Sequence, residues 1–591
     1  MLKLLKYARP YLWLFIVLLG LIYIQVYANL ALPDYMAKIV NEGIVAKDNA
    51  SIWSNGYRML AISLLGGVAA IGLSFLASRI ATSYSRNIRE RVFKKVENFS
   101  LNEFNKFSTA SLITRSTNDV QQIQFVSIMI MRLALSAPIT GVWAIYKAYH
   151  LAPSMTWLMA TSVGVLITVI IILFYVAIPK FKILQSLVDK LNLVTRQNLT
   201  GLRVIRAFNN EQKEQKNFEK ANADLTDVNL FVNRLMVVMQ PIMMLILNVT
   251  TIAIVWVGAH LINSGTLQIG DMIAYMQYAM QVIISFLMIS IVFIMVPRAS
   301  VAADRVAEIL ETEPTINDPE KPVSAEEGKG QIEFKNVVFT YPGAEAPVLV
   351  DVSFVAKPGL TTAFIGSTGS GKSTVVNLIP RFYDVTAGAI LIDGVDVRQY
   401  SQEDLRRRIG YVPQKGVLFS GTIKSNIKYG APEALDEEVI RAAKISQAEE
   451  FIDTLEKKYD SPIAQGGANV SGGQKQRLSI ARAIVKKPEI YIFDDSFSAL
   501  DFRTDAQLRE ALKAETKQRT TLIVAQRVST IMDADNIIVL NEGRIVGIGR
   551  HKDLLGTCQV YREIATSQLS NEELGIEEEG SPEFEPVKEN I

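Results

Sequence analysis

The sequence is poor in the residues that build disulfide and zinc sites. Its 591 residues include one Cys and three His. One Cys excludes a disulfide framework, and three His leave little for a structural zinc site. The 61 Lys and Arg nearly balance the 59 Asp and Glu, so the net charge of +2 gives no bulk electrostatic reason to bind nucleic acid.

Charged residues are also scarce, at 20% of the chain against 49% hydrophobic residues, and the mean hydropathy is +0.21. A bilayer core about 30 Å thick requires roughly 20 apolar residues in a helix. Six runs, all before residue 300, meet this requirement: about 11–32, 57–80, 123–146, 155–178, 235–257 and 273–296. Six successive runs are too many for buried helices of a soluble protein. Residues 1–310 are therefore predicted to form a six-helix all-α transmembrane domain.

The first apolar run begins too soon after Met1, and is too long, for a cleaved signal peptide. Residues Leu2–Arg9 are instead predicted to form an amphipathic segment on the membrane surface. Lys and Arg are concentrated between the second and third runs and between the fourth and fifth, whereas residues 150–154 and 259–271 contain none. Basic connections stay in the cytoplasm, so both of these and both termini are predicted to be cytoplasmic.

The two basic connections are too long to be turns. Apolar and charged residues alternate at helical spacing over residues 85–104 and 183–229, with Gly201 the only Gly or Pro. These segments are predicted to be helices that project beyond the bilayer.

The chain changes character after about residue 310. Residues 311–330 are rich in Pro, Glu and Lys and are predicted to be a linker. Residues 331–570 alternate strand-like and helix-like pieces, which predicts an α/β domain. Residues 571–591 contain eight Glu and little apolar content, which predicts a disordered acidic tail.

A phosphate-binding loop follows the short apolar strand 362–365 and precedes an apolar helix, as the pattern G-x-x-x-x-G-K-[ST] requires. Its glycines let backbone N–H groups approach phosphates at the positive end of a helix. Lys372 can reach the β- and γ-phosphates, and Ser373 can offer its hydroxyl to Mg²⁺. The loop predicted to hold ATP is Gly366, Ser367, Thr368, Gly369, Ser370, Gly371, Lys372, Ser373 and Thr374. The domain is thus predicted to be a P-loop nucleotide-binding domain.

A second apolar strand, residues 489–493, ends in Asp494. A carboxylate at the end of a buried strand can bind the Mg²⁺ of a nucleotide. An Asp after a strand is common, and it is the upstream loop that favours the metal role here.

A glycine-rich motif lies between these elements, about twenty residues before Asp494, and a basic helical segment follows it. The motif is Val470, Ser471, Gly472, Gly473 and Gln474. With these residues the chain resembles the ATP-binding cassette (ABC) family, whose signature is L-S-G-G-Q.

Further family elements match in order along the chain. Tyr341 resembles the aromatic residue that stacks on adenine, and Gln414 resembles the Q-loop residue that meets the metal. Ser498 and Asp501 resemble the ends of the D-loop. The segments 114–120 and 199–208 are similar to the two cytoplasmic loops of ABC exporters.

The resemblance covers essentially residues 1–570. It is to half transporters of the type IV, ABCB-like multidrug exporter family, and implies ATP and Mg²⁺ as cofactors, a dimer, and a multi-pass protein of a bacterial cell membrane.

Two positions depart from the family pattern. Where the family places the Glu that polarises the attacking water, this chain has Asp495, and where it places the switch His, this chain has Gln526. The shorter carboxylate ends roughly 1.5 Å back, and a misplacement of about 1 Å can cost 100-fold in rate. The Gln526 amide is always neutral and cannot adapt its protonation as an imidazole does. Residues 463–466 also depart from the motif that contacts the coupling helices.

Both changes weaken hydrolysis, whereas the residues expected to hold ATP are intact. The chain is therefore predicted to be the degenerate-site subunit of a heterodimer, whose partner has the Glu and the His. The intact Ser471–Gln474 would complete the partner's hydrolytic site. Sequence drift at Asp495 and Gln526 that leaves ATP hydrolysis adequate remains an alternative.

The predicted function is ATP-driven export of amphipathic drugs, lipids or peptides. Four amides within the spans could face a substrate or could join helices: Gln240, Asn248, Gln277 and Gln281. An importer with an exporter fold and an ATP-binding regulatory subunit remain alternatives. A protease-linked peptide exporter is disfavoured because few residues precede the first span.

Overall fold

A computed structural model describes residues 2–323 and 328–574, which form two compact units. The first unit contains the chain up to Glu97 and Ser108–Glu313. The second contains Asn98–Phe107 and the chain from Pro314 onward. The membrane and nucleotide units, as we call them, are considered separately below.

Six helical segments of the membrane unit are long and apolar enough to cross a membrane, and they contain the six predicted runs. Their main helices are α1 (Leu12–Lys38), α2 (Asn49–Glu97), α5 (Val120–Met129) with α6 (Ser136–Leu151), α7 (Thr156–Thr200), α9 (Glu211–Asn263) and α10 (Ile269–Glu311). Shorter elements flank them: η1 (Leu2–Tyr11), η2 (Ile39–Val45), α4 (Thr109–Thr114), η3 (Arg115–Asp119), η4 (Ile130–Ala134) and η5 (Pro153–Met155). The predicted six-helix domain is confirmed.

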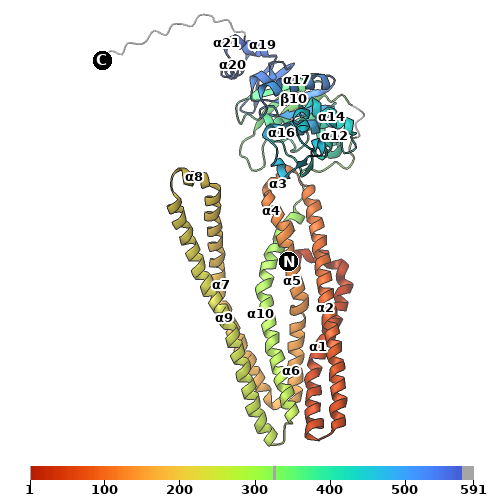
Figure 1. Ribbon diagram of the computed structural model, residues 1–591, viewed down its shortest axis with the longest axis vertical. Coiled ribbons are helices and arrows are strands. Elements are labelled where there is room, and N and C mark those ends of the chain that lie inside the picture. Colours follow the sequence, from red (N-terminus) through yellow and green to blue (C-terminus); the bar gives the residue numbers. More distant parts are fainter. Residues whose placement is uncertain (1, 324–327, 575–591) are drawn as a thin grey trace, which may run out of the picture. The chain divides into compact units, whose positions relative to one another are not determined.

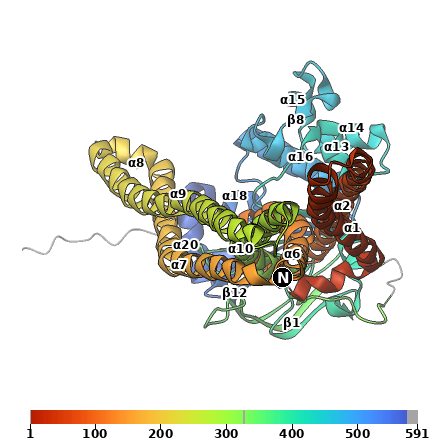
Figure 2. The same cartoon turned by 90° about the horizontal axis from the view of Figure 1, so that it is seen from below.

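Within this unit, α7 and α9 form a long hairpin with the short α8 (Leu202–Ala207) at its turn (Figures 1 and 2). The other long helices pack around a buried core that includes Leu18, Ile80 and Tyr278. A separate small cluster, Leu166, Met243 and Ile283, joins the hairpin to α10, and other hairpin residues reach the main core. Part of the apolar surface of the hairpin stays exposed and is available to lipid or to another chain.

The predicted helices beyond the bilayer are interrupted. Over 85–104, α2 ends at Glu97 and α3 (Leu101–Phe107) begins after a break, because Ser100 and Glu103 form a cap in which the Ser100 N–H donates to Glu103 Oε2 at 2.9 Å. Over 183–229, the chain turns at Gly201 and again at Asn209, whose φ is +49°. Helices therefore cover most of both segments, as predicted, and the interruptions are a finding of the structure.

An ion pair joins three helices of the membrane unit. Lys147 Nζ on α6 lies 2.5 Å from Asp34 Oδ2 on α1, and the Tyr278 hydroxyl on α10 donates to the same carboxylate.

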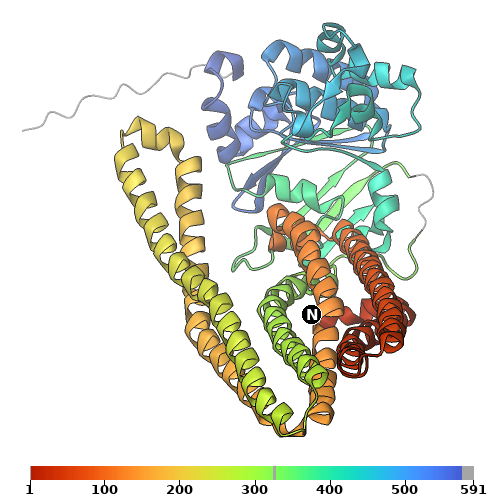
Figure 3. The same cartoon turned by 60° about the horizontal axis from the view of Figure 1, so that its bottom comes forward.

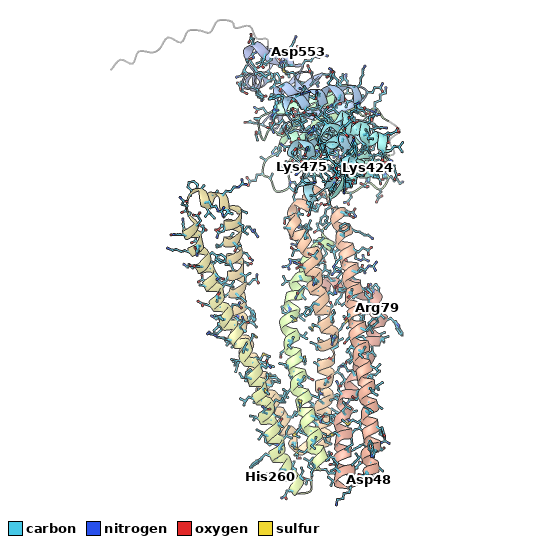
Figure 4. The ribbon with its side chains drawn as sticks, viewed as in Figure 1. Asp48, Arg79, His260, Lys424, Lys475 and Asp553 are labelled. Carbon is cyan, nitrogen blue, oxygen red and sulfur yellow. The ribbon has the colours of Figure 1, made fainter. Side chains whose placement is uncertain are left out.

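The labelled Asp48 and His260 lie at the same end of the helices of this unit (Figure 4). The short turns after η2 and α9 are thus at the same end.

The nucleotide unit contains three β-sheets (Figure 3). In the six-stranded sheet the order is β12-β11-β3-β10-β9-β6, with β12 alone antiparallel. The others are an antiparallel sheet β2-β1-β4-β5 and the pair β7-β8. The strands are β1 (Ile332–Phe339), β2 (Leu349–Ala356), β3 (Thr361–Gly366), β4 (Ala387–Ile392), β5 (Val395–Asp396), β6 (Ile409–Val412), β7 (Gly421–Thr422), β8 (Pro462–Ile463), β9 (Ile490–Asp494), β10 (Thr520–Val524), β11 (Asn536–Asn541) and β12 (Arg544–Gly549).

Alternation along the central strands divides the core into two layers. On β3, Phe364 packs into the core shared with the antiparallel sheet, whereas Ala363 and Ile365 pack on the opposite face against the C-terminal helices. Successive residues of a strand point to opposite faces, so the short apolar strand must be covered on both sides. The α/β architecture predicted for this half is confirmed.

The helices of this unit are α3, already described, and eleven that follow β3: α11 (Lys372–Leu378), α12 (Gln402–Arg407), α13 (Ile423–Lys428), α14 (Asp436–Ile445), α15 (Glu449–Asp453), α16 (Gly472–Val485), α17 (Phe502–Glu515), α18 (Val528–Ile531), α19 (His551–Thr557), α20 (Gln559–Thr566) and α21 (Asn571–Leu574). The 3-10 turns are η6 (Val397–Gln399), η7 (Lys458–Asp460) and η8 (Gln465–Gly467). Of the predicted acidic tail, residues 575–591 lie outside the described residues. Its first four residues form α21, because Ser570 and Glu573 cap that helix.

Candidate functional site

The predicted nucleotide residues meet where three parallel strands end. Strand β10 lies between β3 and β9, and the three run in the same direction. The phosphate loop follows β3. Asp494 is the last residue of β9 and Asp495 comes next, while Gln526 lies just after the end of β10. Ligands of α/β sheets bind at the carboxyl ends of strands, so this edge is the expected place for a nucleotide.

The phosphate loop wraps around the start of α11. Gly371 has φ +95°, and a Cβ there would lie 2.6 Å from Leu349 Cδ2, so this position requires glycine. Lys372 Nζ donates to the carbonyl oxygens of Gly366 at 2.9 Å and Ser367 at 2.7 Å. Burial lowers the pKa of Lys372, and the nearby Asp495 and Asp494 carboxylates oppose that shift. The ammonium group is therefore held over the loop, where phosphate oxygens could replace the carbonyls.

Ser373 and Asp494 form the adjacent oxygen cluster. Ser373 Oγ donates to Asp494 Oδ1 at 2.8 Å, and the Tyr411 hydroxyl lies 3.5 Å from Asp494 Oδ2. Asp494 is only 4% exposed, and burial raises its pKa above the usual value. A cation at this carboxylate would remove the cost of burying its charge.

Asp495 is bound by two amide groups. Gln526 Nε2 donates to Asp495 Oδ2 at 2.7 Å, and Gln414 Nε2 donates to the same oxygen at 3.0 Å. The backbone N–H of Asp495 donates to Val524 O at 2.9 Å, and its φ is +48°. The two positions that depart from the family pattern thus contact each other directly, with the Q-loop amide as the third member.

A cavity of about 550 Å³ runs along the phosphate loop, within the usual size of ligand pockets. It is lined by eight of the predicted loop residues and by both glutamines: Gly366, Ser367, Thr368, Gly369, Gly371, Lys372, Ser373, Thr374, Gln414 and Gln526. Ser370 is buried, and its hydroxyl accepts a hydrogen bond from Lys372 Nζ at 3.4 Å.

Tyr341 belongs to an aromatic cluster beside the loop. Its hydroxyl lies 3.1 Å from Thr374 Oγ1, and its ring meets the Tyr383 ring edge-on at 5.2 Å. The Tyr383 hydroxyl accepts a hydrogen bond from Asn105 Nδ2 of α3 at 3.3 Å. A contiguous set of contacts thus leads from the predicted adenine site to α3.

The predicted signature residues lie apart from this cavity, whereas the D-loop begins beside Asp495. Ser471 caps α16 by accepting from the Gln474 N–H at 3.3 Å, while Ser471, Gly472 and Gly473 stay at least partly exposed. Lys475 of the same helix is labelled in Figure 4. In the D-loop, Ser498 Oγ donates to Asp495 O at 3.0 Å, and Asp501 caps α17. The described lining of the cavity includes no residue of the signature.

Comparisons with known proteins match both halves of the chain. The ABC transporter transmembrane region matches residues 15–286, and the ABC transporter domain matches residues 349–498. An uncharacterized ABC transporter ATP-binding protein of Mycobacterium tuberculosis is 41% identical over 574 residues, or 96% of this chain and 98% of the relative.

The chain belongs to the ABC transporter family. The protein YfiB of Bacillus subtilis, also an uncharacterized ABC transporter ATP-binding protein, is 37% identical over 96% of this chain and 99% of its own length. A solved bacterial Atm1-family ABC exporter with ATP bound is 26% identical, with a TM-score of 0.77, over 95% of this chain and 99% of that one. This ABC transporter is thus a half transporter of the exporter type, a multi-pass membrane protein with one ATP-binding domain.

The sequence did not identify several residues of the cavity in this ABC transporter. Val348 and three C-terminal residues, Ile564, Ser567 and Gln568, also line it. The positions of the C-terminal residues follow no spacing rule relative to the phosphate loop, since the first of them, Ile564, lies 190 positions after Thr374. The Tyr383–Asn105 contact was also missed, although the sequence showed both the motif of the neighbouring Tyr341 and the apolar residues of α3.

Proposed function

We propose that this ABC exporter is one half of a heterodimer, and that its own ATP site holds nucleotide but turns it over slowly. The observation that supports this most strongly is the Asp495 carboxylate, which is short and accepts two hydrogen bonds from neutral amides. A general base must reach the proton it removes, and it acts best when its lone pairs are free. The Gln414 and Gln526 amides occupy the oxygen that would otherwise face water.

The nucleotide-holding residues have the opposite character. Lys372 would bind the β- and γ-phosphates, the loop N–H groups would cradle them, and Tyr341 would stack on the adenine. Ser471–Gln474 would complete the site of the partner, because a signature that is exposed and absent from the described lining of its own cavity is free to meet another chain. Ser498 and Asp501 of the D-loop would lie at the same interface.

The residues at Asp494 fit Mg²⁺. A hydroxyl and a carboxylate oxygen, from Ser373 and Asp494, lie within hydrogen-bond distance of each other. Gln414 lines the same cavity, and its side-chain carbonyl oxygen would be a further hard ligand. Mg²⁺ is usually bound by one or two carboxylates plus the substrate phosphates. When bound with ATP, the ion neutralises charge on the phosphates, while Ser373 and Asp494 fix its place.

The transport substrate is proposed to be amphipathic. The candidate amides Gln240, Asn248, Gln277 and Gln281 form no hydrogen bond between side chains of different helices in the part of the chain that the structure describes. An unpaired amide is costly in lipid, which favours a cavity-facing role. Met244 and Met280 are exposed and could adapt to varied apolar compounds. The curated relatives include an ATP-dependent lipid A-core flippase of Syntrophus aciditrophicus, 31% identical over 97% of this chain.

We propose a cell membrane location with both termini in the cytoplasm. The turn after α9, which lacks Lys and Arg, lies at the end of the helices marked by His260 (Figure 4), as expected for an outer face.

The test is an asymmetry of ATPase activity in proteoliposomes. This chain is co-expressed with a candidate partner half transporter that carries the Glu and the His. We expect Asp495→Asn to leave at least half of the activity of the pair, and Glu→Gln at the equivalent position of the partner to lower it about 100-fold or more.

Robust ATP-driven transport by this chain reconstituted alone would contradict the heterodimer. Equal losses from the two substitutions would contradict the slow site. An ATP-binding regulatory subunit predicts a third result, in which Lys372→Ala in this chain leaves coupled transport by the pair unchanged.

A further inference from the structure

Gln568 connects the C-terminal segment to the loop that carries Gln526. It follows α20 directly, and its side chain makes two hydrogen bonds to the backbone of that loop. Gln568 Nε2 donates to Gln526 O at 2.9 Å, and Gln568 Oε1 accepts from the Val528 N–H at 2.8 Å. Gln568 also lines the nucleotide cavity.

Neither of these two backbone groups is given a partner by the loop itself among the described hydrogen bonds. The loop runs from β10, where the Ala525 N–H donates to Phe364 O, to the start of α18 at Val528. The first N–H groups of a helix have no partner within that helix. One side-chain amide thus supplies an acceptor for α18 and a donor for the carbonyl of Gln526. A carboxylate would supply only acceptors.

The position of Gln568 is fixed by the core, but its side chain is not part of the core. Tyr561 and Ala565 of α20 are fully buried against β3 and β11, and Leu569 packs at the edge of the same cluster. Gln568 itself is exposed. Changing its side-chain chemistry therefore removes no apolar packing.

We propose that Gln568 is a positioning residue of the nucleotide site: it holds the backbone of Gln526 so that the Gln526 amide meets Asp495 and the phosphate side of the cavity. The C-terminal segment is then a working part of the site. The role concerns how this chain binds ATP and does not depend on which subunit hydrolyses it.

The test compares MgATP with MgADP binding to the purified full-length chain in lipid nanodiscs, by displacement of a fluorescent trinitrophenyl nucleotide. Gln568→Glu keeps the shape and the acceptor but places an oxygen against the Gln526 carbonyl. We expect it to lower the preference for ATP over ADP about fivefold, which is the effect of one lost hydrogen bond. Gln559→Glu is the matched control, since Gln559 also belongs to α20 but contacts only the exposed Glu563.

A double-mutant cycle separates positioning from general stability. If Gln568 acts through Gln526, the change in ATP preference from Gln568→Glu disappears in a Gln526→Ala background. The proposal is wrong if Gln568→Glu lowers ATP and ADP affinity equally, if it changes neither, or if its effect persists without the Gln526 side chain. Thermal unfolding without nucleotide shows whether the variants fold. Should the heterodimer proposal fail, this result keeps its meaning, because only binding is measured.

Discussion

The two sides of the nucleotide cavity differ in how they handle charge. On the holding side, burial lowers the pKa of Lys372 and raises the pKa of Asp494, so these two groups, together with Ser373, would gain from a bound magnesium nucleotide. On the reaction side, the single charge of Asp495 is already satisfied by the amides of Gln414 and Gln526. We propose that a site arranged in this way favours ATP occupancy over turnover, because of two side chains rather than the fold.

The largest expected effect concerns the holding side. Lys372→Ala should weaken MgATP binding at least about 100-fold, because the ammonium group is buried beside the phosphate loop and a charge-assisted contact to phosphate is lost. Equilibrium binding of a fluorescent ATP analogue measures it. Lys357→Ala, at an exposed position after β2, is the control and should bind normally. An unchanged affinity in Lys372→Ala would remove the distinction between the two sides.

A second prediction concerns the reaction side, where the Glu and the His of the family pattern are restored. The pair Asp495→Glu and Gln526→His should raise ATP turnover by the isolated chain about 10- to 100-fold, since the longer carboxylate reaches forward and the imidazole can exchange protons. Steady-state phosphate release checks it. Asp495→Asn should give no rise. If the double variant is as slow as the native chain, slow turnover originates outside these two positions.

The smallest expected effect is the dependence of thermal stability on pH. Gln526 cannot titrate, and His551 is the only His of the nucleotide unit. His551 Nδ1 lies 2.6 Å from the Tyr561 hydroxyl, and burial lowers the pKa of His551 below 6.5. A base with a lowered pKa in the folded state contributes stability that is fully present above about pH 6.5 and is lost as the pH falls toward the folded value.

We therefore expect the unfolding temperature to fall by about 1–3 °C between pH 7 and pH 5.5, and His551→Gln to flatten that slope. Differential scanning fluorimetry at fixed ionic strength measures it. MgATP affinity should show no inflection attributable to Gln526 over the same range. A slope that is identical in His551→Gln would assign the pH effect to other groups.

The sequence predicted the elements of this protein better than it predicted their contacts. Apolar runs of about 20 residues identify spans because lipid imposes a length, and the phosphate loop is visible because its glycines are required at fixed spacing. The helix break at Asn98–Ser100 was missed, since a Ser–Glu cap inside a helical pattern is a weak signal. The Gln568 contacts were missed for another reason: they join residues 40 and 42 positions apart, and no local sequence pattern predicts that the fold brings them together.

The short helix α3 has a consequence for biosynthesis. It is part of the nucleotide unit, yet Asn105 is made 278 residues before its partner Tyr383. At about 5–20 residues per second, α3 leaves the ribosome roughly 15 to 60 s before the surface that receives it exists. During that interval four of the six spans are synthesised. The nucleotide unit therefore cannot be completed by the C-terminal part of the chain alone, and a fragment that begins at Pro314 would lack a piece of its own structure.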